Sequence, residues 1–132
     1  MPSVRKSLTI AAPPAQVWAA LTSPKAIAAW MGGPVTSNPR AGGRLALFGG
    51  ATTGRYTLVE KPARLEYTWR QAEWPAEWAD SRVRWTLKAT RAGTRVTLTH
   101  DRFPNEAERQ GHAEGWDVYW LEPMRRWLEG AA

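Results

Sequence analysis

The 132-residue chain contains no cysteine and only two histidines. Without cysteine there is neither a disulfide framework nor a thiolate nucleophile. Two histidines do not make a metal site, and no third ligand stands at a recognisable spacing from them, so no metal and no other cofactor are expected. Glycine-rich phosphate loops and serine-elbow motifs are also missing, so phosphoryl and acyl transfer have no support in the sequence.

Long apolar runs are missing too. No stretch approaches the roughly 18 residues of a membrane span, and the first ten residues, MPSVRKSLTI, lack the long apolar region of a signal peptide. We therefore expect no membrane partner and a reducing, cytoplasmic setting. With 43% hydrophobic and 23% charged residues, the composition fits one globular domain over residues 1–132.

The net charge of +6 raises the question of nucleic acid binding. The basic residues are dispersed, however. In the segment RVRWTLK, residues 82–88, basic and apolar side chains alternate, which is typical of a strand with one solvated face. We expect no nucleic acid partner.

Helical periodicity is longest between Asn105 and Glu129. Asn105 with Glu108 three residues later resembles a capping box, and Gly130 is a suitable C-terminal stop. Pro123 is expected to kink this helix. The kink either fits the helix to a curved sheet or frees a backbone carbonyl as a polar group inside a cavity. At about 100° per residue the predicted inner stripe holds His112, Trp116, Tyr119, Trp120, Pro123 and Trp127.

The rest of the chain predicts short helices and then strands. A strand is expected over residues 7–11, and two helices over 13–22 and 24–31. After Gly42 the apolar period changes to alternation, which predicts five hairpin-linked strands at residues 44–48, 54–60, 64–69, 81–90 and 94–101. This order predicts an α+β fold, with an antiparallel sheet that has one wet face and one face against the long helix.

Short segments spread over nearly the whole chain match a known family in order. They contain Pro14, Val17, Trp18, Leu21, Thr22, Trp30, Gly42, Gly43, Gly54, Pro62, Arg64, Leu65, Tyr67, Thr68, Trp69, Ser81, Arg82, Val83, the segment GTRVTLTH at 93–100, Phe103, Pro104, His112, Gly115 and Trp116. With these residues the chain resembles a START-like (SRPBCC) domain of the type related to the activator of heat-shock-protein-90 ATPase. The resemblance implies a helix-grip fold, in which a bent sheet wraps the C-terminal helix around an internal cavity. The chain departs from the family at Trp120, Pro123 and Trp127, where relatives usually carry leucine.

Alternation along the strands and the helical stripe together predict the residues of a ligand site. These residues either line a pocket or simply fill it, because cores and ligand pockets use the same residue types. Each indole N–H also needs a partner and can orient a ligand. The predicted ligand-binding residues are Trp69, Trp85, Leu87, Val96, Leu98, His100, His112, Trp116, Tyr119, Trp120 and Trp127.

His100, His112 and Tyr119 are the candidates for proton transfer. If the helix packs on the last strand, the two histidines approach each other. Each is either a hydrogen-bonded structural residue or a general acid or base.

The loop from Gln71 to Ser81 carries Trp74 and Trp78 among acidic residues. Tryptophans expected to be exposed on a loop have three interpretations: a lid over the cavity mouth, a protein-contact patch, or local packing against Pro75. We take the lid as the working hypothesis.

Three functions follow from these patterns. The leading hypothesis is binding of a small, largely apolar or aromatic molecule in an internal cavity. The second is an enzyme that works by proton transfer in the same cavity. The third, which rests on the resemblance, is a co-chaperone-like interaction module, and formation of a homodimer stays open.

Overall fold

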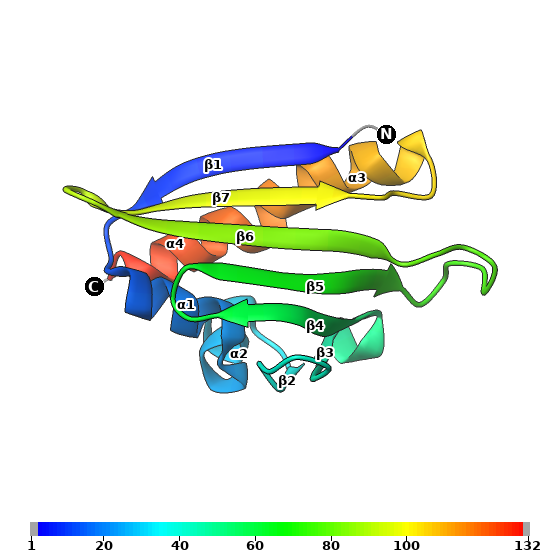
Figure 1. Cartoon of the computed structure of the whole chain (residues 1–132), viewed down its shortest axis with the longest axis horizontal. Coiled ribbons are helices and arrows are strands. Elements are labelled where there is room, and N and C mark those ends of the chain that lie inside the picture. Colours follow the sequence, from blue (N-terminus) through cyan, green and yellow to red (C-terminus); the bar gives the residue numbers. More distant parts are fainter. Residues whose placement is uncertain (1–2, 131–132) are drawn as a thin grey trace.

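A single antiparallel sheet organises the chain in the computed structural model, which describes residues 3–130. Its order is β1-β7-β6-β5-β4-β3-β2, so the six consecutive strands β2 to β7 form a meander and the first strand returns beside the last (Figure 1). The strands are β1 (Val4–Ile10), β2 (Thr36–Ser37), β3 (Arg44–Leu47), β4 (Thr52–Glu60), β5 (Arg64–Gln71), β6 (Ser81–Thr90) and β7 (Gly93–Asp101). The α+β prediction and the antiparallel sheet are confirmed.

Two details of the strand prediction were wrong. The first strand begins at Val4 rather than Ser7, because Val4 pairs with His100 and extends the ladder with β7. The two-residue strand β2 was not predicted, since two residues are too few to show alternation.

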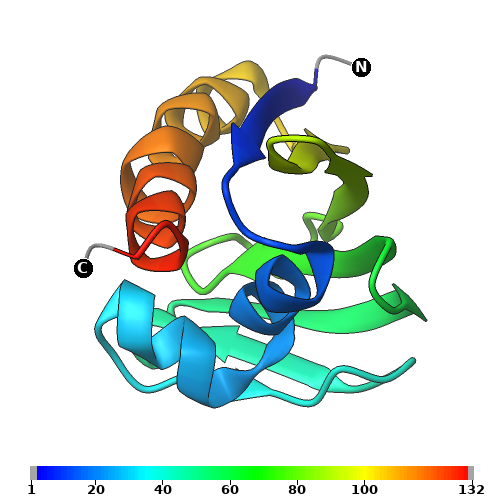
Figure 2. The same cartoon turned by 90° about the vertical axis from the view of Figure 1, so that its left-hand side faces the viewer.

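Two short helices close one end of the sheet. The helices α1 (Pro14–Thr22) and α2 (Pro24–Met31) each carry a proline in the first turn. The Ser23 side chain accepts a hydrogen bond from the backbone N–H of Ala26, and Gly32 ends α2 with a φ of 82°. Both helices lie near the C-terminal end of the long helix (Figure 2).

The long helix packs against the inner face of the sheet, which curves round it (Figure 2). It consists of α3 (Glu106–Gly115), a π-helical turn η2 (Trp116–Leu121) and α4 (Glu122–Leu128). Asn105 Oδ1 accepts from the backbone N–H of Glu108 at 2.9 Å, so the predicted N-cap is confirmed. The backbone stays helical through both junctions, so the helix is unbroken.

The inner stripe of this helix differs from the prediction. Tyr119 and Trp127 are 63% and 42% exposed, so their placement on the inner face was wrong. Instead, Trp116, Trp120, Leu121 and Met124 are buried. The π-helical turn explains the change, because each residue in an i→i+5 turn rotates less than the 100° of an α-helix. Side chains after Trp116 are therefore displaced round the axis by about one position.

Candidate functional site

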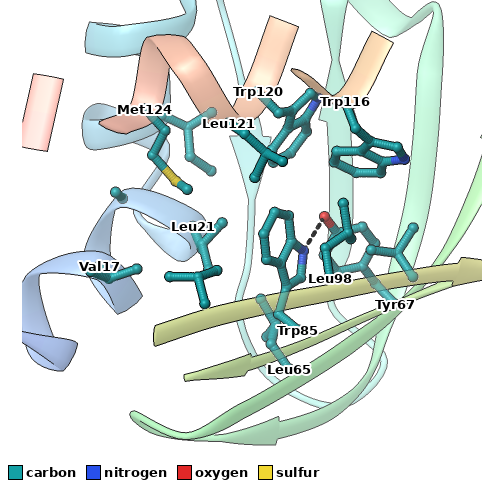
Figure 3. Close-up of a cluster of buried hydrophobic side chains, with 14 of the residues drawn as sticks. Val17, Leu21, Leu65, Tyr67, Trp85, Leu98, Trp116, Trp120, Leu121 and Met124 are labelled. Carbon is teal, nitrogen blue, oxygen red and sulfur yellow. Dashed lines mark hydrogen bonds between the residues drawn. The ribbon is translucent and has the colours of Figure 1, made fainter. Parts of the chain in front are cut away.

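Seven ring side chains meet between the sheet and the long helix, and we call them the aromatic cluster. The inner faces of β5, β6 and β7 contribute four of them, and the helix contributes three. Figure 3 shows Tyr67, Trp85, Trp116 and Trp120 of this group. The cluster consists of Tyr67, Trp69, Trp85, His100, His112, Trp116 and Trp120. Sequence reasoning did not name Tyr67 as a site residue, although its alternation with Leu65 and Trp69 put it on the same face.

The rings of the aromatic cluster are in mutual contact. Trp116 lies at centroid distances of 4.9 Å from both Trp69 and Trp120, and 5.7 Å from Trp85. These spacings and tilted orientations are those of packed aromatic pairs. In this conformation the rings leave no room for another ring between them.

His100 stands at the centre of a chain of buried hydrogen bonds. Its Nδ1 accepts from Trp116 Nε1 at 3.0 Å, so the ring proton must be on Nε2. His100 Nε2 then donates to Ser81 Oγ at 2.7 Å, and Ser81 donates to the carbonyl of Trp69 at 2.8 Å. The chain therefore fixes one tautomer of His100.

His112 is held in the opposite tautomer. Its Nε2 accepts from Trp69 Nε1 at 3.0 Å, so Nδ1 carries the proton and donates to the carbonyl of Glu108 at 2.7 Å. The two imidazoles lie 5.1 Å apart, as expected if the helix packs on the last strand.

The environment of His100 opposes protonation. Burial and, to a smaller extent, the neighbouring His112 lower the pKa of His100 from 6.5 to about 2. Both ring nitrogens of both histidines are already engaged by partners in the protein. A general base needs a free lone pair, and Tyr119 is exposed on the far side of the helix, so this geometry gives the proton-transfer hypothesis no support.

Tyr67 is the member of the aromatic cluster with an incomplete hydrogen-bond pattern. Its hydroxyl oxygen accepts from Trp85 Nε1 at 2.9 Å (Figure 3). Within residues 3–130 the hydroxyl donates no hydrogen bond of its own, although the residue is only 1% exposed. Burial strongly raises the pKa of Tyr67, so this proton stays on the hydroxyl.

Tyr56 is a useful contrast because it faces Tyr67 edge to face at 5.7 Å. Ser37 donates to the carbonyl of Thr22, so the Tyr56 hydroxyl must donate to Ser37 Oγ at 2.6 Å. Burial raises the pKa of Tyr56 to about 12. Of the two facing tyrosines, only Tyr67 has a donor that is free toward the inner layer.

The other predicted ligand-binding residues are divided between the core and the surface. Leu87, Val96 and Leu98 are buried on the inner face of the sheet, as alternation predicted. Tyr119 and Trp127 lie outside the inner layer for the reason given above. Whether the buried residues bind a ligand stays a prediction.

The loop between β5 and β6 is folded onto the start of the long helix. Trp74 is 4% exposed and donates from Nε1 to Glu108 Oε1 at 2.9 Å, so the expectation of an exposed Trp74 was wrong. Arg70 explains the fold of the loop, since its guanidinium donates to the carbonyls of Trp74, Pro75 and Trp78. Glu108 thus binds the loop instead of completing the predicted capping box.

One hollow of the molecular surface, of about 250 Å³ beside β5 and β6, has Tyr67 of the aromatic cluster among its lining residues. A larger one, of about 420 Å³, lies beside α1 and is lined by residues that include Trp18, Pro39 and Val59. Another, of about 290 Å³, lies on the outer face of the sheet. Within residues 3–130 no helix is long and apolar enough to cross a membrane. The same residues contain no group of three or more metal-ligating side chains that could hold an ion.

A bent antiparallel sheet round one long helix defines a helix-grip, START-like protein. Residues 11–129 match the model of the family described as activator of Hsp90 ATPase homolog 1-like protein, and the chain belongs to this family. The START-like resemblance seen in the sequence is thereby confirmed.

Three known proteins illustrate this relationship. Protein MLL2253 from Mesorhizobium loti has 26% identity and a TM-score of 0.84, with 99% of each chain covered. The Aha1 dimer from Colwellia psychrerythraea shares the fold at a TM-score of 0.84 and 19% identity, with 98% of each chain covered. An uncharacterized protein, C1711.08, from Schizosaccharomyces pombe is 29% identical over 72 residues, which are 54% of this chain and 21% of that protein. The match thus spans about a fifth of the yeast protein.

Proposed function

We propose that the protein binds a small, largely apolar or aromatic molecule with one hydrogen-bond acceptor, held between the sheet and the C-terminal helix. The observation that carries this proposal is the free hydroxyl proton of Tyr67 inside the aromatic cluster. Buried hydroxyl donors almost always have an acceptor, and one without a partner costs about 1–3 kcal/mol. A ligand carbonyl or ether oxygen at this point would supply the missing acceptor.

The aromatic cluster suits such a molecule in its other properties. Trp85, Trp116 and Trp120 offer ring faces and edges to a planar apolar ligand. The N–H groups of Trp85 and Trp116 already have partners in the protein. Because the rings are now in contact, the ligand must separate the helix from the sheet. The π-helical turn lies directly over the aromatic cluster, and such turns occur frequently at functional sites.

The test uses Prodan, a neutral naphthyl ketone whose emission reports the polarity of its surroundings. We expect saturable binding, with energy transfer from the tryptophans to the probe. Tyr67→Phe should weaken binding about tenfold, the worth of one buried hydrogen bond, whereas the matched change Tyr56→Phe should leave it unchanged. Trp120→Ala should weaken probe binding by more than it lowers the free energy of unfolding.

Two results would contradict the proposal. One is equal probe affinity in Tyr67→Phe and Tyr56→Phe. The other is absence of any thermal shift across a broad panel of aromatic ketones, ethers and esters, since a ligand specific for the folded state must raise Tm. Native mass spectrometry of the protein as purified would show a ligand that is retained from the cell.

A protein-interaction role, like that of a co-chaperone, is the second candidate. Its supporting observation is the exposure of Val118 and Tyr119, at 58% and 63%, on the outer side of the long helix over a filled interior. Binding to full-length Hsp90 from the same source should then fall in Val118→Ser and Tyr119→Ser, with Prodan binding unchanged. Sedimentation of the same variants tests whether this surface forms a homodimer instead, and unchanged behaviour in both assays rejects this candidate.

A further inference from the structure

A second candidate site lies on the outer face of the sheet, opposite the aromatic cluster. Two guanidinium groups and three hydroxyls line a hollow of about 290 Å³, and no carboxylate is among its lining residues. The lining residues are Arg5, Arg84, Thr86, Thr97 and Thr99.

The strand register arranges these donors in two rows. Thr99 pairs with Arg84 on one side and with Arg5 on the other, and Thr97 pairs with Thr86 in the next row. Neighbouring strands are about 4.8 Å apart, so the two arginines start roughly 10 Å apart with Thr99 between them. That spacing lets both guanidinium groups reach one anion above the central strand from opposite sides.

Arg84 has hydrogen-bonding capacity to spare. Its Nε is buried and has no hydrogen-bond partner within residues 3–130. Its one ion-pair contact is to Asp101 Oδ2 at 3.2 Å. Asp101 is mainly engaged by Arg82, which donates to both carboxylate oxygens at 3.0 and 2.7 Å. The hydrogen bonds from Arg82, together with the charges of the nearby arginines, lower the pKa of Asp101.

We propose that this hollow binds the phosphate group of a small phosphorylated molecule. A tetrahedral phosphate presents oxygens in several directions and can take donors from both arginines and from the threonine hydroxyls at once. A planar carboxylate would be saturated by one guanidinium and would leave the second unused. The carboxylates of Glu66 and Asp101 lie among the arginines of this face. The positive charge is therefore not continuous along the face, as binding of a polyanion would require. The inference is independent of ligand binding in the aromatic cluster.

The experiment is a titration with inorganic phosphate at constant ionic strength, with chloride as the balancing anion. Backbone and threonine resonances of β1, β6 and β7 report binding at the hollow. We expect saturation in the native protein and at least a tenfold loss of affinity in Arg5→Gln. Arg84→Lys keeps the charge next to Asp101 but removes Nε, and it should also lose affinity. Arg95→Gln is the matched control, because it removes one positive charge from the same face outside the lining, and it should stay within twofold of the native protein.

Each alternative gives a different result. Equal losses in Arg5→Gln and Arg95→Gln, or shifts that do not saturate, would mean general charge screening and overturn the site. Unchanged affinity in Arg84→Lys and Thr97→Val would overturn the assigned donors. Tight binding of single-stranded DNA or of phosphatidic acid vesicles, with weak binding of a small phosphate ester, would show that the phosphate belongs to a nucleic acid or a lipid. It would overturn the proposal of a small phosphorylated molecule. Circular dichroism of each variant verifies that the fold is kept.

Discussion

His100 shows how one buried residue acquires a fixed chemical state from its partners. The indole of Trp116 occupies its Nδ1 and Ser81 occupies its Nε2, so protonation of the ring would break one of these hydrogen bonds. Phe103 covers the ring at a centroid distance of 4.1 Å. The residue therefore stabilises the neutral inner layer through these hydrogen bonds.

The stability of the protein should fall as the pH drops from 7 to 5. The unfolded chain takes up a proton on His100 below pH 6.5, whereas the pKa of about 2 keeps the folded form neutral. Stability that is present above pH 6.5 is thus lost at up to about 1.4 kcal/mol per pH unit below it. Chemical denaturation at pH 7, 6 and 5 measures this slope.

The acidic groups act in a different window. The pKa values of Asp101, Glu106 and Glu129 are lowered from 3.8, 4.5 and 4.5, so their contributions to the free energy of unfolding are lost only at lower pH.

His100→Gln can make the same two hydrogen bonds without titrating, so its free energy of unfolding should change little from pH 7 to 5. An unchanged slope in His100→Gln would refute the assignment.

Single residues also mark the limit of what the sequence could predict. Alternation placed Trp69, Trp85 and His100 on the inner face, because a strand's period is fixed by its geometry. It could not single out Tyr67, since a free hydroxyl proton depends on the positions of all neighbouring acceptors. These positions are set by long-range packing, such as the contact with Trp85 that lies 18 residues away.

At the scale of elements, the prediction of the long helix was right about where the helix begins and ends but wrong about which of its residues face the sheet. Asn105 and the glycine at position 130 marked its ends correctly, because capping is a local property. The π-helical turn is not local, and Pro123 directly after it already removes one backbone donor. The smaller rotation per residue in this turn places Tyr119 and Trp127 outside the inner layer and Leu121 and Met124 inside it.

The loop from Gln71 to Ser81 is the element whose motion we predict. Trp74 is buried against the helix. Burial of the two loop indoles stabilises the closed form by about as much free energy as ordering roughly ten residues costs, so the open and closed forms differ little in free energy. We expect the loop to be mobile without a ligand and ordered with one. Replacing Trp74 and Trp78 with serine should therefore speed release of Prodan more than it slows association.

Hydrogen exchange and stopped-flow fluorescence test the loop together. Glu108→Gln is a milder control, because it weakens the acceptor of Trp74 Nε1 without removing the indole. It should change the release rate in the same direction but less. Equal protection of residues 71–81 with and without Prodan would rule out the lid.

At the scale of the whole molecule, the sheet separates two chemical environments. Along β6 the inner residues Val83, Trp85 and Leu87 are buried, while Arg82 and Arg84, which alternate with them, reach the outer face. The sequence predicted this division and the hairpin order of the strands, since both follow from period and turns. It could not decide whether the rings line a pocket or fill the inner layer, because packing density depends on the final distance between helix and sheet.

Ligand binding in the filled inner layer should move the helix and leave the sheet in place. A planar ring needs about 3.5 Å of additional thickness, the ordinary contact distance between carbon atoms. The strands β5, β6 and β7 are fixed by continuous backbone ladders, whereas the helix is held to the sheet by side-chain packing and by contacts such as the Lys6–Asp117 ion pair at 2.7 Å. Saturation with Prodan should therefore change amide exchange in Trp116–Leu121 and leave the centres of these strands unchanged.

Lys6→Gln removes the ion pair to Asp117 without changing the aromatic cluster, so it should raise the association rate of the probe. Lys88→Gln on the outer face is the matched control. Equal changes of exchange in helix and sheet, or equal association rates in the two variants, would show that the ligand is bound elsewhere.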